Sequence, residues 1–570
     1  MARETGGIRR RKFLAGGAAG GAAVLAGTGP AAPARAAEAA PAAEPVTVVT
    51  PKDKRYPDLV RGWNQRWVAS PEKVCLPETT DQVVQVVQQA VSAGKRLTVR
   101  GGGHCWEDWV FNPEVRVVLD MTKMNKVSYD ARTNSIAVEA GAQLLNVYER
   151  MYRTWGVVIP AGMCFQVGAG GHVSGGGWGL LCRRLGLVVD HLYGVEVVTV
   201  DADGVARARV ATRETTDPDR DLWWAHTGGG GGNFGVVTRF FFRSPGATGT
   251  DPSALLPQPP AEVLLSAVSW PWAEMTESRF ARLVKNYGDW HAKYLKPGTP
   301  GDNLVSMLAL NHRSNGAIGL ITQVDATAPD AEKILDGFLA AMTAGVDVAH
   351  RPLTVPMGEL AAMPELAAPR RMPWLQAARY LGTTNPTLND PSLKGDFKSA
   401  YYRTAMPAGH VKEFYRHLTR TDLVNPTASV LLSSFGGQVA AVAPDATASA
   451  HRASAYKAAW MIWWTDPADE ALSLRWIREF FHGVYADTGG VPVPNAVTDG
   501  CYVNYPDIDL HDPAYNTSGV PWYTLYYKGG YPKLQQVKAA YDPRDVFRHS
   551  QSVRLPKKDR NEPTEKGRDT

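Results

Sequence analysis

From about residue 46 to residue 244 the chain alternates short apolar runs with amphipathic stretches, which is typical of alternating strands and helices. Between residues 83 and 91, valine and alanine recur at helical spacing. We therefore expect a helix that Thr80 and Asp81 cap and that Gly94 ends. The valine-rich runs predict strands at Leu97–Arg100, Val115–Leu119, Ile136–Val138, Val195–Val200 and Val236–Phe242.

The pattern changes after Pro245–Pro260, a proline- and glycine-rich segment that we interpret as a linker. Apolar runs then alternate with helical patterns at 329–342 and 467–484, an order that favours an antiparallel sheet with helices on one face. Turn-forming residues in Arg379–Lys398 predict a long loop over a site. Strands are expected at Val263–Val268, Leu304–Leu310, Ile318–Val324 and Trp460–Trp464.

We expect the N-terminus to be a targeting segment and not part of the fold. Arg10-Arg11 precedes Phe13-Leu14 and the weakly apolar run Ala15–Gly27, which is too short to span a bilayer. This order favours a twin-arginine signal, read by the twin-arginine export machinery, with cleavage near Ala34-Arg35-Ala36. The alternative is the basic region of a general secretion signal. We therefore expect a secreted protein, and no other stretch is long and apolar enough for a membrane anchor.

Composition and charge narrow the class of protein. A chain of 570 residues with 44% hydrophobic residues is too long for one ordinary core, so two large domains or one interrupted domain are expected. The net charge of +5 is spread thinly, and Lys/Arg-rich stripes occur only at the two ends, which argues against a nucleic-acid partner. The charged segment Lys557–Thr570 is expected to be disordered.

Three glycine-rich loops carry the candidate chemistry: Arg100–His104, Gly162–Gly179 and Gly228–Gly235. Because glycine lacks a Cβ, backbone N–H groups in such loops can approach a pyrophosphate or a flat ring closely. Histidine and cysteine are both nucleophilic enough to add to an electrophilic ring. The loops therefore predict a flat anionic cofactor, with His104 and Cys164 as candidates for a covalent bond to it.

The chain has five cysteines, so in an exported protein at least one thiol is unpaired or otherwise used. A metal site built from Cys164, His172 and Cys182 would give the intervening glycines no purpose, and no metal site is expected. If Cys164 bonds a cofactor, four cysteines remain and their pairing stays open: Cys75, Cys105, Cys182 and Cys501.

The three loops, together with Tyr502–Asp507 and Tyr541–Phe547, resemble the berberine bridge enzyme-like branch of the vanillyl-alcohol oxidase superfamily. The resemblance runs from about Val68 to Val553 and includes several motifs in the same order, which makes it specific. It implies an α+β fold with a two-lobed FAD-binding domain of the PCMH type and a substrate domain whose antiparallel β-sheet is flanked by helices. With the expected signal and tail, the chain divides into a twin-arginine signal and linker at 1–45, the FAD-binding domain at 46–245, the substrate-binding domain at 246–499, a C-terminal segment returning to the FAD domain at 500–556 and a disordered tail at 557–570.

The resemblance also implies FAD that is bonded to the chain twice. By position, His104 would bond the 8α-methyl carbon and Cys164 would bond C6 of the isoalloxazine; the alternatives are a loop histidine and a buried thiol. Val167 matches a family position where valine goes with dioxygen access, which favours an oxidase. The other residues expected at the cofactor are Arg100, Gly101, Gly102, Gly103, Gly168, Gly170, Gly171, His172, Gly175, Gly231, Gly232, Asn233 and Asn504.

Oxidation of an alcohol needs a base, because the O–H proton must leave as the hydride moves. The resemblance gives this role to Tyr505, with Tyr502 alongside; the alternative is a core tyrosine. In an extended segment Tyr502 and Asn504 would share one face and Tyr505 would lie on the other, so we expect a bend at Pro506. A nearby cation or the oxidised flavin would have to lower the pKa of Tyr505.

The substrate domain gives weaker signals. Plant members that form alkaloids use a glutamate shortly after a Gly-Gly pair, whereas Phe435–Ala441 has Gln438 and no acid, which counts against alkaloid bridge formation. Tyr402 and Gln438 are the preferred candidates for substrate contact.

The resemblance favours an oxidase that converts an alcohol of a sugar, an oligosaccharide or a glycosylated natural product to an aldehyde, lactone or acid. Dioxygen would reoxidise the flavin and be reduced to hydrogen peroxide. One alternative is oxidative cyclisation or desaturation of a non-sugar metabolite at the same flavin site. Another is a flavin-binding protein without turnover, which the joint presence of His104, Cys164 and Tyr505 disfavours.

Overall fold

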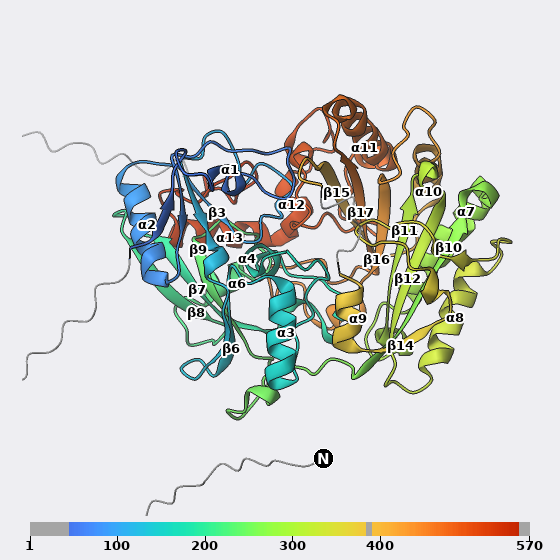
Figure 1. Cartoon of the computed structure of the whole chain (residues 1–570), viewed down its shortest axis with the longest axis horizontal. Coiled ribbons are helices and arrows are strands. Elements are labelled where there is room, and N and C mark those ends of the chain that lie inside the picture. Colours follow the sequence, from blue (N-terminus) through green and yellow to red (C-terminus); the bar gives the residue numbers. More distant parts are fainter. Residues whose placement is uncertain (1–44, 383–389, 558–570) are drawn as a thin grey trace, which may run out of the picture. The chain divides into compact units, whose positions relative to one another are not determined.

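The computed structural model describes residues 45–382 and 390–557. The expected export signal and nearly all of the charged tail lie outside these residues, so the statements about them stay predictions. The described residues from Val46 onward form one compact unit. Its strands build three sheets, two within residues 47–242 and the largest within residues 262–464, on either side of the predicted linker (Figure 1).

The first sheet has four strands in the order β1-β2-β4-β3. β2, β4 and β3 run parallel, whereas β1 is antiparallel to β2. Parallel strands need a crossover connection, and helix α2 connects β2 to β3, which lie on the two sides of β4. The strands are β1 (Thr47–Val49), β2 (Lys73–Leu76), β3 (Leu97–Arg100) and β4 (Val117–Asp120).

Helix α2 (Thr80–Ser92) confirms the predicted helix, with a shifted cap. The Thr79 side chain caps it by accepting a hydrogen bond from the N–H of Gln82, so the expected capping by Thr80 and Asp81 is wrong by one residue. The valines at helical spacing are buried against the sheet, which is why the helix forms here.

The second sheet has five antiparallel strands in the order β5-β6-β9-β7-β8. β9 has the predicted bounds, and β6 and β7 extend the predicted strands by a few residues. The strands are β5 (Val127–Asp130), β6 (Ser135–Glu139), β7 (Leu192–Val200), β8 (Ala206–Thr212) and β9 (Val236–Phe242).

The third sheet has eight antiparallel strands and is the sheet predicted after the linker. Seven of them follow the order β13-β10-β12-β11-β16-β17-β15, and β14 also pairs with β10. The strands are β10 (Glu262–Pro271), β11 (Leu304–Asn311), β12 (Ala317–Asp325), β13 (Arg351–Pro352), β14 (Arg370–Pro373), β15 (Lys394–Tyr402), β16 (Ser429–Ser434) and β17 (Tyr456–Trp464).

Four helices cover one face of this large sheet, as predicted (Figure 1). They are α7 (Glu277–Lys293), α8 (Ala331–Thr343), α10 (Ala408–Leu418) and α11 (Glu470–Val484). The shorter or more distant α-helices are α1 (Tyr56–Leu59), α3 (Leu144–Trp155), α4 (Ala169–Ser174), α5 (Cys182–Leu185), α6 (Arg220–Ala225), α9 (Trp374–Tyr380), α12 (Trp522–Tyr527) and α13 (Tyr531–Tyr541). No helix of the described residues is both long and apolar enough to cross a membrane.

Strand β17 shows how the large sheet separates its two faces. Successive side chains of a strand point to opposite sides. Trp460 packs against Phe414 of α10 and Phe480 of α11, with ring centroids 5.4 and 5.9 Å apart. Lys457 and Met461 point to the other face, where they line a cavity. The opposite face of the sheet is therefore available for a binding site.

The predicted loop Arg379–Lys398 is only partly a loop. Arg379 belongs to α9, and β15 begins at Lys394; residues 383–389 of the predicted loop lie outside the described residues. Strand β15 was not predicted because Lys398 lies in its middle. The Nζ of this buried lysine forms ion pairs of 2.7 Å with the carboxylates of Asp507 and Asp509. A charged residue inside a strand removes the alternation that would have predicted it.

Candidate active site

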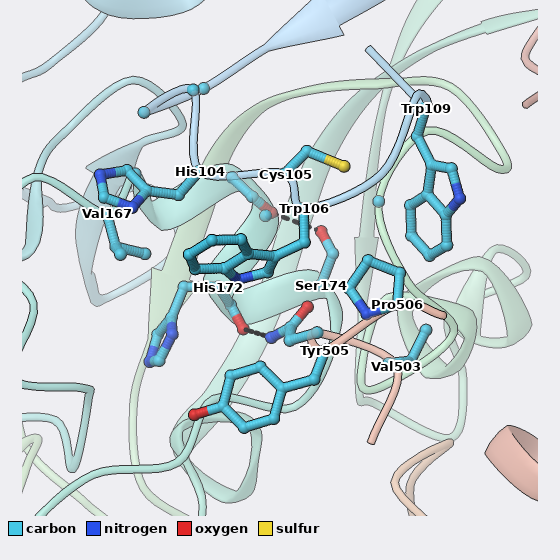
Figure 2. A pocket seen from close by; sticks show the side chains of 18 of the residues that line it. His104, Cys105, Trp106, Trp109, Val167, His172, Ser174, Val503, Tyr505 and Pro506 are labelled. Carbon is cyan, nitrogen blue, oxygen red and sulfur yellow. Dashed lines mark hydrogen bonds between the residues drawn. The ribbon is translucent and has the colours of Figure 1, made fainter. Parts of the chain in front are cut away.

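A cavity lies between the glycine-rich loops and the face of the large sheet opposite the helices. Its wall is formed by Arg100–His104, by parts of the second and third glycine loops, and by the C-terminal segments Tyr502–Pro506 and Phe547–His549. The large sheet contributes Met307, Phe397, Leu431, Lys457 and Met461. Figure 2 shows residues around the cavity, among them His104, Val167, His172 and Tyr505.

Two of the glycine loops touch so closely that neither accepts a side chain at the point of contact. A Cβ on Gly102 would lie 2.3 Å from the backbone nitrogen of Gly168, and one on Gly168 would lie 2.2 Å from that of Gly102. By contrast, a Cβ on Gly171 would meet nothing within 4 Å, because the backbone there faces the cavity. The loops therefore fix each other while leaving bare backbone at the wall.

His104 lies on the cavity wall beside Arg100. Burial, with a smaller contribution from the Arg100 guanidinium, lowers the pKa of His104 to about 4. The imidazole is therefore neutral at neutral pH, the form in which a ring nitrogen can act as a nucleophile. Its ring stacks on Trp63 with the centroids 5.3 Å apart.

Cys164 also lines the cavity, and its thiol donates a hydrogen bond to Oε2 of Glu359. Glu359 lies at the tip of a tight turn between Met357 and Leu360, whose backbone groups exchange hydrogen bonds of 2.9 and 3.0 Å. Gly358 permits this turn with a φ of 56°. Sequence reasoning missed Glu359, because a single acid in a loop forms no pattern.

Two buried donors at the wall fit a large polar ligand. Nε of Arg100 and Nε1 of Trp109 have no hydrogen-bond partner among the described residues. The Trp109 ring stacks on His549 with the centroids 4.1 Å apart. Buried donors are normally paired, so these atoms, together with the bare backbone at Gly171 and Gly231, fit a ligand with phosphate and heterocyclic groups such as FAD.

His172 lines the cavity, and its hydrogen bonds also hold the second glycine loop in place. Its Nε2 accepts a hydrogen bond of 3.1 Å from the N–H of Gly162, and its carbonyl accepts one of 3.0 Å from the Asn504 amide. Burial lowers its pKa to about 4, so it is neutral. Asn504 packs against Gly175, where a Cβ would lie 2.0 Å from the amide oxygen. Gly175 therefore serves this close approach and does not line the cavity.

The segment Tyr502–Tyr505 is a turn and not an extended strand. The N–H of Tyr505 donates a hydrogen bond of 2.9 Å to the carbonyl of Tyr502, so the chain already turns before Pro506, where the bend was expected. The turn brings both tyrosines to the cavity, with ring centroids 5.2 Å apart. Burial raises the pKa of Tyr502 to about 12.

Lys457 is the cation expected beside Tyr505. Its Nζ lies 3.2 Å from the Tyr505 hydroxyl oxygen and 4.6 Å from the ring centroid. Burial lowers the pKa of Lys457 to about 7. The low pKa expected for Tyr505 is not found, because burial raises it well above its usual value and Glu359 and Tyr502 raise it further. A signal for Lys457 was present: it is the one charged residue in the strand Tyr456–Trp464.

Asn233 supports the third glycine loop from outside the cavity. Its amide donates to the carbonyls of Gly229 and Gly230 at 2.9 and 3.2 Å, and its side-chain oxygen accepts from the N–H of Val553 at 2.8 Å. It therefore shapes the wall without lining it.

Tyr402 and Gln438 do not lie where substrate contact was expected. The Tyr402 hydroxyl is on the helix face of the sheet, 2.9 Å from the hydroxyl of Tyr485 and 3.1 Å from Nδ1 of His410. Phe397 and Tyr402 are an odd number of positions apart in β15, so they face opposite sides. Gln438 lies in a short 3-10 helix and is absent from the cavity wall.

The described residues contain no group of three or more His, Cys, Asp or Glu side chains that could hold a metal ion. All five cysteines lie in this part of the chain, and none forms a disulfide there. Cys105 joins Cys164 at the cavity, whereas the other three are buried elsewhere.

Comparisons with known proteins show the family of the chain. Residues 71–207 match the FAD binding domain family, and residues 501–554 match the family of berberine and berberine-like proteins. Over 511 residues the chain is 49% identical to the aclacinomycin-N/aclacinomycin-A oxidase of Streptomyces galilaeus, a match that covers 88% of this chain and 89% of the relative.

Two solved structures share the whole fold. CrmK, a flavoenzyme involved in shunt product recycling in caerulomycin biosynthesis, superposes with a TM-score of 0.85 at 46% identity over 90% of this chain and 100% of that one. A glycopeptide hexose oxidase complexed with teicoplanin gives a TM-score of 0.83 at 42% identity, over 90% and 99% of the two chains. The chain therefore belongs to the berberine bridge enzyme-like family of FAD-linked oxidoreductases.

Proposed function

We propose that the protein is a secreted oxidase that removes a hydride from an alcohol carbon of a carbohydrate or of a glycosylated natural product. FAD, held covalently through His104 and Cys164, would supply the hydride acceptor, and dioxygen would take up the electrons and become hydrogen peroxide. The observation that carries this proposal is the contact of 3.2 Å between Nζ of Lys457 and the Tyr505 hydroxyl at the cavity.

Tyr505 is the proposed base. The substrate hydroxyl proton passes to the phenolate oxygen of Tyr505 as the hydride leaves the neighbouring carbon. Burial alone disfavours the phenolate, since it raises the pKa of Tyr505. The ammonium of Lys457 stabilises the phenolate charge, so the contact is what makes this tyrosine usable as a base.

The cofactor would be held by residues from separate loops. His104 and Cys164 bond the ring system, the neutral imidazole of His104 being ready as a nucleophile. The bare backbone at Gly171 and Gly231 faces the cavity and supplies N–H groups suited to phosphate oxygens. Val167 at the cavity wall supports access of dioxygen, by its resemblance to the family position.

The wall formed by the large sheet supports a substrate with an apolar part. Met307, Phe397, Leu431 and Met461 line it, together with Met357. An unsubstituted oligosaccharide would leave hydroxyl groups without partners against such a surface. A sugar attached to a hydrophobic aglycone fits better, and two relatives have names that refer to glycosylated antibiotics.

The first test replaces Tyr505 by Phe. Flavin should stay on the polypeptide after acid precipitation, while its reduction by substrate slows by roughly 10² to 10⁴-fold, since a general base typically contributes that much. Stopped-flow absorbance measures this rate. Tyr129→Phe, which removes a hydroxyl that donates a hydrogen bond to Oδ1 of Asn134 in the turn after β5, is the matched control. Rapid reduction in Tyr505→Phe would show that another base operates.

The substrate class is tested by a screen with peroxide as the readout. Glycosylated polyketides and glycopeptides should release hydrogen peroxide, and free oligosaccharides much less. If only non-glycosylated metabolites react, the enzyme is an oxidative cyclase or desaturase instead. Peroxide in the medium of cells that secrete the protein, lost when Arg10 and Arg11 are both changed to Lys, would support export by the twin-arginine route.

A further inference from the structure

We propose that Glu359 is the base that removes the thiol proton of Cys164 when this cysteine bonds to the flavin. The inference rests on the proposed function, because it assumes a bond between Cys164 and FAD. It assigns a step of cofactor attachment to a residue that follows strand β13 of the large sheet, outside the glycine-rich loops.

A cysteine must lose its proton before it can attack, because the thiolate and not the thiol is the nucleophile. Glu359 is placed for this step, since its Oε2 accepts the hydrogen bond of the Cys164 thiol. A carboxylate that already accepts this hydrogen bond needs no movement to take the proton.

Two other titratable groups near the Cys164 loop are committed to different contacts. The hydroxyl of Tyr148 donates to the carbonyls of Ala161 and Gly162, and burial raises its pKa, so it is not a base. Nε2 of His172 accepts the N–H of Gly162 at 3.1 Å. Lys457, which also lies near Cys164, donates to the Tyr505 hydroxyl, whereas Glu359 accepts the hydrogen bond of the thiol itself.

The turn that carries Glu359 is held firmly. Met357 and Leu360 are buried, at 2% and 1% exposure, and their reciprocal hydrogen bonds close the turn. Three and four residues beyond the two ends of this turn, the N–H of Met363 donates to the carbonyl of Leu353 at 2.9 Å. A two-residue turn on such a base fixes the direction of the side chain at its tip.

The surroundings also suit a proton acceptor. Burial raises the pKa of Glu359, while the Cys164 hydrogen bond and the Lys457 charge oppose the shift. A raised pKa brings the Glu359 carboxyl closer to the pKa of a thiol, and a smaller difference in pKa eases the proton transfer. Tyr505 is the third titratable group that faces Glu359 in this cluster.

The attachment step balances with dioxygen as the oxidant. Glu359 takes the proton from Sγ of Cys164, and a sulfur lone pair forms the bond to C6 of the ring. The proton on that carbon leaves, and the two electrons of its C–H bond pass through the flavin to dioxygen, giving hydrogen peroxide. Glu359 then returns its proton to water, so a thioether and one molecule of peroxide are the net products.

The test uses a His104→Ala background, in which Cys164 would be the one remaining covalent tether. Each variant is incubated with FAD in air, and flavin retained after acid precipitation is followed with time; the mass of the peptide containing Cys164 confirms the site. Adding Glu359→Gln should slow attachment by roughly a hundredfold, the low end of what a general base contributes. Adding Cys164→Ser gives the zero reference, and Glu365→Gln, an exposed neighbour that bonds Tyr380, should change nothing.

Raised pH separates a base from a structural support. Hydroxide ionises the thiol without help, so the Glu359→Gln defect should shrink as the pH rises. Glu359→Asp, which keeps a carboxylate, should attach faster than Glu359→Gln at neutral pH. Equal rates in Glu359→Gln and its His104→Ala parent, or equal slowing in the Asp and Gln variants at every pH, would overturn the inference. If the parent itself carries no flavin on Cys164, the double attachment of the proposed function fails instead.

Discussion

Lys457 places a positive charge among aromatic side chains. Its Nζ lies 4.0 Å from the ring centroid of Trp178 and 4.9 Å from that of Tyr502. Cation–π contacts recover part of the lost hydration, yet burial still lowers its pKa from 10.5 to about 7. The unfolded chain binds this proton up to a higher pH than the folded chain, so the residue lowers stability most below pH 7 and least above its usual pKa.

Replacing Lys457 by Met should therefore separate catalysis from stability. The melting temperature at pH 7 should not fall, because a buried cation is exchanged for an apolar chain of similar length. Flavin reduction by substrate should slow by roughly a hundredfold, because the Tyr505 phenolate loses its cation. Stopped-flow absorbance and thermal unfolding measure the two effects. Lys457→Arg, which keeps the charge, should lose less; a Met variant that reduces at the normal rate would remove Lys457 from the mechanism.

At the scale of elements, the first glycine loop and the start of α4 act as one unit because they interlock at Gly102 and Gly168. Gly168→Ala would force a Cβ to within 2.2 Å of the Gly102 nitrogen. Overpacking of this kind costs roughly 1–3 kcal/mol, and here it also displaces the cavity wall. We expect lower unfolding free energy in urea and less flavin per polypeptide.

Gly337→Ala in α8 is the matched control for this prediction. A Cβ there meets nothing within 4 Å, so the change should stabilise the helix by about 0.5–1 kcal/mol and leave the flavin content unchanged. If both variants behave alike, the close approach of the two loops does not matter for binding.

The same elements show what the sequence could predict. Strands with regular apolar patterns, such as β3 and β9, have the predicted bounds, since burial on a sheet leaves a local signature. Motif residues such as His104, Cys164 and Tyr505 do meet at one cavity. Partners that approach from distant segments left no local pattern: Glu359 stands alone in a turn. The prediction that Tyr402 contacts the substrate was wrong because successive side chains of a strand point to opposite faces, so a shift of one residue moves a side chain to the other face.

At the scale of the whole chain, the C-terminal segment closes the cavity wall against the first half. Nζ of Lys538, which is fully buried, donates to the carbonyl of Asn233 at 2.9 Å and to Asp542 at 2.7 Å. The Tyr527 hydroxyl donates to the carbonyl of Gly229 at 3.1 Å. The third glycine loop is thus shaped by contacts some three hundred positions away in sequence, so the wall forms only when the whole fold does.

Because the cavity wall depends on the whole fold, the site also depends on the stability of the fold in acid, to which buried histidines contribute. Burial lowers the pKa to about 3 or 4 for a set of them spread over all parts of the chain: His104, His172, His226, His291, His312, His417, His451 and His549. Below their usual pKa of 6.5 the unfolded chain binds protons that the folded chain does not. Stability should therefore fall as the pH drops from 6.5 toward 4.

The slope of this loss is the measurable consequence. Each such histidine contributes up to about 1.4 kcal/mol per pH unit, so several together should unfold the protein cooperatively well above the pH where carboxylates titrate. Urea unfolding at pH 7, 6 and 5 measures the slope. His291→Gln, at a site where the ring bonds the Tyr287 carbonyl at 2.9 Å and Ser434 at 2.7 Å, should lower stability at pH 7 but make the slope shallower. A stability that stays flat between pH 7 and 5 would mean that these side chains take up protons in the folded state, which would require the cavity and core around them to admit water.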